Sequence, residues 1–254
     1  MEAQQTVLSF IKKDAFFLFF GIFLLIGISW FSLFSIFSAM NAASMDSMMQ
    51  TSPWEFTAVL ITFAMWLAMM AAMMLPSAIP MISLFSNVYK KRAEQKKAQV
   101  PSWIFLFGYL FIWALFSIVA ALLQTLLKYF NILSPNLAII NTHLSGILLV
   151  GMGAYQFTSI KKQCLSHCQS PIDFLSSHWM EGKKGALQMG IHHGIYCLGC
   201  CWALMALLFV VGIMNIVWIA VLTGIVFAEK SFKKQWTTKV TGIILVSMGI
   251  WILM

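Results

Sequence analysis

Uninterrupted apolar runs of bilayer-spanning length recur along this chain and limit what it can fold into. A helix of about 20 residues crosses the roughly 30 Å of hydrocarbon in a bilayer, and the run from Ala15 to about Ala39 is longer than that. Hydrophobic residues make up 61% of the 254 residues, whereas charged residues make up 9%. Because backbone polar groups in lipid must be satisfied within the chain, the sequence predicts an all-α, polytopic membrane helix bundle surrounded by the lipid bilayer.

We expect about seven transmembrane helices. They lie near residues 15–39, 56–86, 102–127, 142–160, 186–211, 214–229 and 238–254. The first run is too long for the core of a signal sequence, which has roughly 7 to 15 apolar residues, so we interpret it as a helix. Pro76 and Pro80 remove backbone donors from the second helix and are expected to kink it.

The distribution of positive charge predicts the orientation of these helices. With a cytoplasmic N-terminus, all Lys and Arg residues except Lys128 fall on the cytoplasmic side. This is the bias that orients membrane proteins during insertion. The formal charge of +8 is therefore interpreted as an orientation signal rather than a nucleic-acid footprint, and we exclude DNA and RNA as partners.

One strongly apolar segment carries a regular series of metal-binding side chains. Met189, His193, Cys197, Cys201 and Met205 stand four residues apart, and Cys200 lies beside them. Four residues of α-helix advance the side chain by about 40° beyond a full turn, so this series lines one stripe. Thioether, imidazole and thiolate groups select soft metals such as Cu(I).

The neighbouring His192 points about 100° away from His193 on a helix. We therefore expect His193 to face the sulfur stripe and His192 to make an interhelical hydrogen bond.

A methionine-rich segment precedes Pro76 and is the second candidate for metal binding. Its ligand candidates are Met65, Met69 and Met73, and alanines occupy the opposite side of the predicted helix. We expect this segment to face the cysteine-bearing helix near the middle of the membrane, where functional polar groups are costly. Packing of methionine against lipid or a neighbouring helix is the alternative interpretation.

An outer loop that contains Met40, Met45, Met48 and Met49 carries no Lys or Arg. It is a candidate collector of soft cations, and a flexible tether at the lipid interface is the alternative.

A cytoplasmic loop at residues 161–185 carries a C-x-x-H-C arrangement. It contains Cys164, His167 and Cys168 beside Lys161 and Lys162. Nearby cations favour thiolates, which bind metals or react. Because the cytosol is reducing, free thiols or a metal site are favoured over a permanent disulfide, and an unreactive solvated loop is the alternative.

Short internal similarities indicate two three-helix halves. Residues 145–155 resemble residues 241–251, and residues 65–69 resemble residues 201–205. An odd number of helices in a repeat inverts its orientation, and inverted repeats are common in transporters. The predicted organisation is a first helix and Met-rich loop at 1–53, a three-helix half at 54–160, a Cys/His loop at 161–185 and a second half at 186–254.

The blocks at residues 72–77 and 194–205, together with Glu229 and Lys230, resemble a bacterial family of predicted metal-binding integral membrane proteins defined by a domain of unknown function. The resemblance runs from about Trp54 to Lys230, and Gly-Cys-Cys-Trp is its most specific part. It implies metal binding in a bacterial inner membrane without naming the metal. Separately, Met69-x-x-x-Met73 is similar to a short motif of eukaryotic copper transporters.

These patterns predict an integral membrane protein that binds a soft metal, with Cu(I) as the leading candidate. It would transport the metal or deliver it to a metallochaperone or membrane metalloenzyme. The candidate ligands are Met65, Met69, Met73, His193, Cys197, Cys200, Cys201, Met205, Cys164, His167 and Cys168.

Two alternatives stay open. A transmembrane thiol-disulfide electron carrier would use the redox-compatible spacing of Cys197 and Cys200. A structural subunit of a membrane complex would need no chemistry. The sequence has no phosphate-binding loop or hydrolase motif that would indicate an ATP-driven pump or an enzyme.

Overall fold

The computed structural model describes residues 2–42, 54–94, 100–134, 137–232 and 236–254, which fold into helices and turns with one isolated β-bridge between Leu133 and Ile139. The helices are α1 (Glu2–Ala42), α3 (Phe56–Glu94), α4 (Trp103–Tyr129), α5 (Thr142–Tyr155), α6 (Ser159–Gln169), α7 (Pro171–Ser177), α8 (Gly182–Ala206), α9 (Leu208–Val211), α10 (Ile216–Ser231) and α11 (Trp236–Leu253). The expected all-helical architecture is confirmed for this part of the chain.

Among the residues that the structure describes, five segments are long and apolar enough to cross a membrane: residues Phe16–Ser38 of α1, and α3, α4, α11 and the combined α8 and α9. The other two predicted spans correspond to α5 and α10, which have only 14 and 16 residues. A membrane-spanning helix needs about 20 residues to cross the hydrocarbon layer. The structure therefore supports five spans, and the count of seven stays a prediction.

The predicted span at 142–160 divides into α5 and α6 because a capping residue lies inside it. The side chain of Thr158 accepts a hydrogen bond from the Lys161 N–H, so a new helix begins at Ser159. Asn141 and Asn215 cap α5 and α10 in the same way.

Residues 161–185, which were expected to form a loop, lie mostly in α6, α7 and the start of α8. Pro171 at the first position of α7 favours that helix. Leu165, Phe174 and Leu175 are buried, so this segment packs on the bundle instead of extending into solvent. The expectation of a loop here was wrong.

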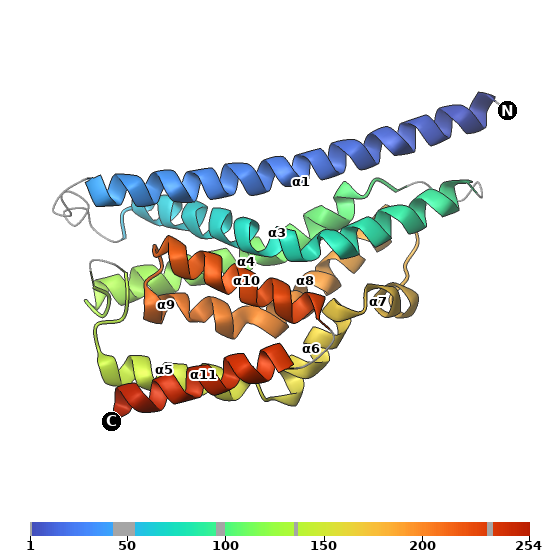
Figure 1. Cartoon of the computed structure of the whole chain (residues 1–254). Helices are drawn as coiled ribbons and strands as arrows, with labels where there is room; N and C mark the ends of the chain where they lie inside the picture. The colour runs from blue at the N-terminus through green and yellow to red at the C-terminus, as the bar shows by residue number, and fades with distance from the viewer. Residues whose placement is uncertain (1, 43–53, 95–99, 135–136, 233–235) are drawn as a thin grey trace.

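The long helices run roughly side by side (Figure 1). Helix α1 lies along α3, and α3 also contacts α4 and α10. Helix α3 bends near its middle in Figure 1, where Pro76 and Pro80 interrupt its backbone donors. Helix α8 packs on α4 and α6, so the predicted ligand stripe lies inside the bundle.

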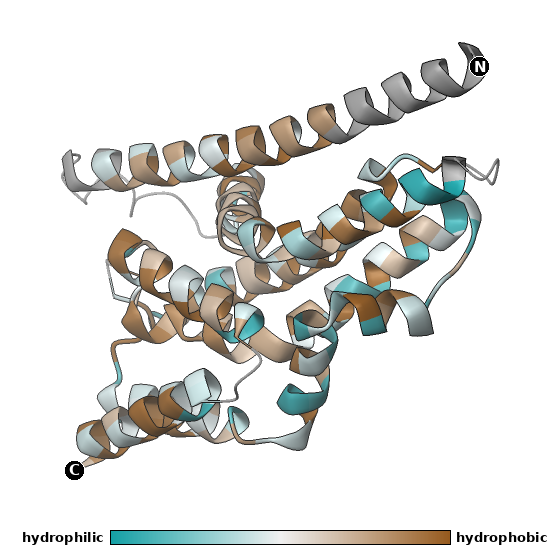
Figure 2. Ribbon diagram, turned by 45° about the vertical axis from the view of Figure 1, so that its right-hand side comes forward, coloured by the Kyte–Doolittle hydropathy of each residue, from teal (hydrophilic) through white to brown (hydrophobic). Residues whose placement is uncertain are grey.

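The two chain ends lie at opposite ends of the bundle (Figure 1). Hydrophilic residues gather at the end that holds the last turns of α3 and the start of α8 (Figure 2). Lys90, Lys91 and Arg92 belong to the first group, and Lys183 and Lys184 to the second. This grouping fits the predicted cytoplasmic side, and the orientation itself stays a prediction.

Glycines bring α4 and α8 into direct backbone contact. A Cβ atom added to Gly190 would collide with the carbonyl oxygen of Phe105, and one added to Gly108 would collide with that of Leu187. Small residues at such contacts let helices approach closely in membranes. The contact fixes Tyr109 of α4 against the cysteine-bearing face of α8.

A second glycine contact joins α5 to α11. A Cβ on Gly153 would lie 3.0 Å from the Gly242 carbonyl oxygen, and a Cβ on Gly249 would lie 2.8 Å from the Gly146 carbonyl oxygen. These four glycines are the ones shared by the similar segments 145–155 and 241–251. Mutual packing is therefore an alternative explanation for that similarity, and the inverted repeat stays a prediction.

We predict that Gly153→Ala destabilises the protein and that Gly151→Ala, on the same helix, does not. The added methyl at residue 153 would meet the backbone of α11, and an overpacked contact costs about 1–3 kcal/mol. The methyl at residue 151 would meet nothing within 4 Å, and alanine stabilises a helix by up to about 1 kcal/mol relative to glycine. Thermal unfolding in detergent measures both, and equal melting temperatures would contradict this account of the helix pair.

Candidate metal centre

The stripe predicted on residues 189–205 forms one buried side of α8. Its members are each at most 3% exposed: Met189, His193, Cys197, Cys200, Cys201 and Met205. The four-residue spacing thus placed these groups correctly on a helix and in the interior. All five cysteines of the chain are free thiols, and Cys164 and Cys168 are half-buried.

Cys197 is the most highly connected sulfur of this stripe. Its Sγ lies 2.9 Å from Lys230 Nζ and 3.2 Å from the Tyr109 hydroxyl. The thiols of Cys200 and Cys201 both donate to the Cys197 carbonyl oxygen, at 3.1 Å and 2.8 Å. The three cysteines of α8 therefore lie close together on one face of the helix, within about one turn.

Lys230 extends from α10 into this group of sulfurs. Its Nζ donates to the Cys197 Sγ and, also at 2.9 Å, to the Ser77 hydroxyl, and it lies 3.9 Å from the Met74 Sδ. Only 9% of Lys230 is exposed. An ammonium in an apolar interior requires partners, and adjacent cations stabilise the thiolate form of cysteine. Lys230 was counted among the cations of the cytoplasmic side; its side chain lies inside the bundle, and the side of the membrane stays a prediction.

Met74 is the methionine that the structure brings to the cysteines. Its Sδ lies 3.9 Å from the Cys201 Sγ. The predicted ligands Met65, Met69 and Met73 are buried on the same helix, but Met73 and Met74 point about 100° apart on α3. Met74 therefore lies in the segment of α3 that holds the predicted ligands, on an adjacent face, and the ligand set stays a prediction.

Helix α6 carries two more cysteines to the same level of the bundle. Interaction with the thiols of Cys197 and Cys200, together with burial, raises the pKa of the Cys168 thiol well above its usual value. The Cys164 Sγ lies 2.7 Å from the position of a Cβ on Gly199, so α6 rests directly on α8. Cys168 joins the central group, which we call the sulfur cluster: Met74, Cys168, Cys197, Cys200 and Cys201.

His167 lies apart from the sulfur cluster. Its ring packs 4.2 Å from the ring of Tyr196 and 5.8 Å from that of His178, measured between centroids. Burial and the nearby His178 lower the pKa of His167. The predicted C-x-x-H-C group therefore divides, with Cys168 in the sulfur cluster and His167 among aromatic rings.

The two histidines of α8 have different surroundings. His193 is enclosed by the rings of Phe105, Tyr109 and Phe174, with centroid distances of 5.4–6.0 Å. In the described part of the chain, Nδ1 of both His192 and His193 is buried without a hydrogen-bond partner. Among the described residues, Nδ1 of His192 therefore does not make the interhelical hydrogen bond that was expected for this side chain.

The cluster is a set of soft donors rather than a conventional closed cage. Within the described ranges, no three side chains of His, Cys, Asp and Glu are grouped so that they could hold a metal ion. Thiolate and thioether sulfur nevertheless fit Cu(I), which favours soft ligands. The outer-loop residues Met45, Met48 and Met49 lie outside the residues that the structure describes, as does the side chain of Met40.

A buried ion pair lies next to the cluster and fixes α6 to α10. Lys161 Nζ is 2.8 Å from Glu229 Oε2, and the two side chains are 0% and 3% exposed. The Gln169 amide also donates to the backbone carbonyls of Glu229 and Phe232. Glu229 and Lys230, adjacent in sequence, thus hold α6 and α8 respectively. The sequence signal for this role is the pair of charged residues, Glu229 and Lys230, at the end of an apolar segment.

A protein-family model described as PpoB2, copper chaperone, matches residues 63–252. The matched region contains every member of the sulfur cluster together with Lys230. No curated protein and no solved structure matches the chain. The match supports a copper-related family. It is not a match to the family with a domain of unknown function that the sequence resembles.

We predict that Glu229→Gln destabilises the protein by about 3–5 kcal/mol, because Lys161 would be left as an uncompensated buried charge. The double variant Glu229→Gln/Lys161→Met should recover most of the loss. Glu181→Gln is the matched control, since its ion pair with Arg92 is exposed, and such a pair contributes at most about 1 kcal/mol. Unfolding in mixed micelles measures all three, and equal effects of Glu229→Gln and Glu181→Gln would contradict a structural role for the buried pair.

Proposed function

The chain belongs to the PpoB2 copper chaperone family, and we propose that it binds Cu(I) at the sulfur cluster and transports it or delivers it to a partner. A copper-related function follows from the family, and the handling of the metal is our proposal. The observation that carries it is the convergence of sulfur groups from α3, α6 and α8 around Cys197.

Cys197 and Cys200 are the central ligands in this proposal. Their thiolates would bind Cu(I) strongly, and Cys168, Cys201 and Met74 supply further sulfur within the same cluster. His193 and Met205 belong to the same buried stripe of α8 and are retained as secondary candidates. Sulfur from several helices allows stepwise ligand exchange, which a protein that passes copper onward requires.

Lys230 supports a copper complex of low net charge. Two thiolates bound to Cu(I) carry one negative charge, and an isolated charge is costly in an apolar interior. The ammonium of Lys230 lies 2.9 Å from the Cys197 sulfur and neutralises that charge. Lysine has no lone pair to offer while protonated, so Lys230 positions and balances the site without acting as a ligand.

The proposed copper path joins α3, the sulfur cluster and α6. Met69 and Met73 line the neighbouring part of α3, and Cys164 lies beyond the cluster against Gly199. Cys168 belongs to the sulfur cluster itself. The path therefore runs along α3 to the sulfur cluster and then to Cys164, with the outer methionine loop as its proposed entrance or exit.

The electron-carrier alternative is less well supported. Thiol exchange requires an accessible thiolate, whereas Cys197 and Cys200 are 1% and 2% exposed. That function also gives no role to the methionine beside the cluster. Copper bound to anaerobically purified protein would distinguish the two functions.

We predict that replacing Cys197, Cys200 and Cys201 together by Ser abolishes copper binding. The hydroxyl is a harder ligand of similar size, so the helices should still pack. Elemental analysis after anaerobic purification, with competition by a Cu(I)-specific chromophore, gives the stoichiometry. Size-exclusion chromatography and thermal unfolding check the fold, and undiminished copper in a folded triple variant would refute the proposed site.

Met74→Leu and Met73→Leu form a matched pair that tests which face of α3 binds the metal. The Met-to-Leu change nearly conserves volume, so both variants should fold. We expect Met74→Leu to weaken Cu(I) affinity about tenfold or more, as the loss of groups around a metal commonly does. Met73→Leu should change it less than about twofold. If Met73→Leu weakened the Cu(I) affinity more than Met74→Leu, the face of α3 predicted from the sequence would be the one that binds the metal.

We further propose an inner-membrane location with a cytoplasmic N-terminus. A cysteine introduced at Gln95 should react with an impermeant maleimide only after the cells are permeabilised. His143→Cys, in the first turn of α5 at the opposite end of the bundle, should react in intact cells. Reaction of the residue-95 variant in intact cells would reverse the orientation.

A further inference from the structure

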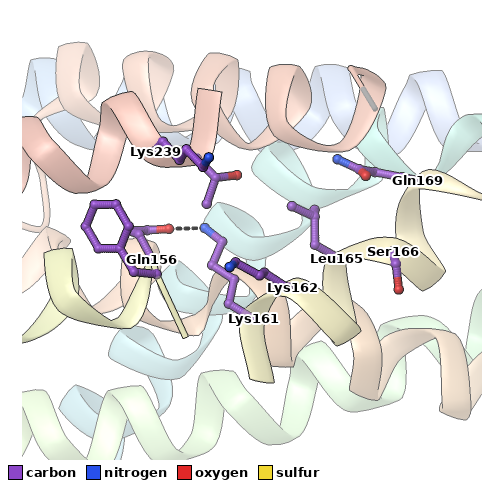
Figure 3. Close-up of a pocket in the computed structure, with 9 residues that line it drawn as sticks. Gln156, Lys161, Lys162, Leu165, Ser166, Gln169 and Lys239 are labelled. Atoms are coloured by element: carbon purple, nitrogen blue, oxygen red, sulfur yellow. Dashed lines mark hydrogen bonds between the residues drawn. The ribbon is translucent and has the colours of Figure 1, made fainter. Parts of the chain in front are cut away.

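A pocket of about 60 Å³, lined by both polar and apolar side chains, lies between α6 and α11 and apart from the sulfur cluster (Figure 3). Its polar walls include Gln156, Lys161, Lys162, Ser166, Thr238 and Lys239. One water molecule requires roughly 10–15 Å³ of such a pocket, so there is room for about four water-sized groups. That is close to the size of a phosphate group.

The pocket has an excess of positive charge. Lys161 is neutralised by Glu229, the acidic side chain that adjoins the pocket. Lys162 and Lys239 also line it and form no ion pair with any residue that the structure describes. Two cations therefore face the pocket without a described counter-charge.

Two buried polar groups at the pocket have an unused hydrogen-bonding atom. Gln156 is 1% exposed, and its Oε1 accepts from Lys161 Nζ, as Figure 3 shows. Its Nε2 donates to no described atom, and the hydroxyl of Thr238, which is 4% exposed, has no partner among them either. Leaving a buried donor unsatisfied costs free energy, so an acceptor in the pocket would stabilise both groups.

The first turn of α11 adds a favourable field. Thr238 and Lys239 belong to this turn, which begins at Trp236. The N–H groups of a first turn lack intrahelical acceptors, and the helix dipole there attracts negative charge.

We propose that this pocket binds a phosphate group, supplied by an anionic phospholipid headgroup or by free phosphate. Two lysines, an amide and a hydroxyl provide the charge-assisted hydrogen bonds that phosphate oxygens accept. Basic pockets between helices on the cytoplasmic side of membrane proteins suit anionic headgroups. The occupant would hold α6 to α11, and α6 is the helix that carries Cys164 and Cys168.

The test uses the full-length, delipidated protein in a neutral detergent. Its melting temperature is measured with added phosphatidylglycerol, with phosphatidylcholine and with inorganic phosphate, and native mass spectrometry counts retained lipids. A ligand that binds only the folded state raises the melting temperature. A rise with phosphatidylglycerol alone identifies a lipid headgroup site, and a rise with inorganic phosphate identifies a free-anion site.

The double variant Lys162→Gln/Lys239→Gln should weaken binding of the effective ligand about tenfold or more. Lys183→Gln/Lys184→Gln is the control, because it removes the same charge from the start of α8 and should change binding less than about twofold. Gln156→Leu, which keeps the net charge, should also weaken binding. Equal losses in both double variants, or no response to either phosphate source, would overturn the proposal and leave a pocket that holds water only.

Discussion

Two ammonium groups buried in an apolar bundle determine how its shorter helices are held. Lys161 is paired with Glu229 at 2.8 Å, and Lys230 contacts Cys197 at 2.9 Å. A buried cation without a partner would be strongly destabilising. Because Glu229 and Lys230 are adjacent on α10, this short helix is bound to α6 through one residue and to α8 and α3 through the next.

Close backbone contact sets the distances within which these polar groups meet. Gly108 and Gly190 allow α4 to touch α8, and this places the Tyr109 hydroxyl 3.2 Å from the Cys197 sulfur. Gly199 allows α6 to approach α8 from another side, with Cys164 against it. A larger side chain at either contact would separate the elements that contribute sulfur to the cluster.

The distribution of donors over three helices suits a protein that passes on copper. In the proposed function, thiolates would retain a soft cation and exchange it among neighbouring sulfurs, and Lys230 would offset the charge of the complex without competing for the metal. The phosphate pocket proposed at α6 and α11 would let the surrounding lipid influence the helix that carries Cys168. The two proposals rest on different residues and stand or fall separately.

The sequence by itself determined the helical membrane class, the long apolar spans and the buried stripe of α8. These follow from hydropathy and from helical periodicity, which are local properties. Periodicity could not select between Met73 and Met74, because neighbouring positions of α3 are almost all apolar and no polar face marks the outside. The distribution of Lys and Arg assigned Lys230 to the cytoplasmic side of the membrane, but it does not show whether the side chain points into the helix bundle. Only the tertiary structure decided that Lys230 turns inward and that α6 folds back onto α8, because those outcomes depend on partners distant in sequence.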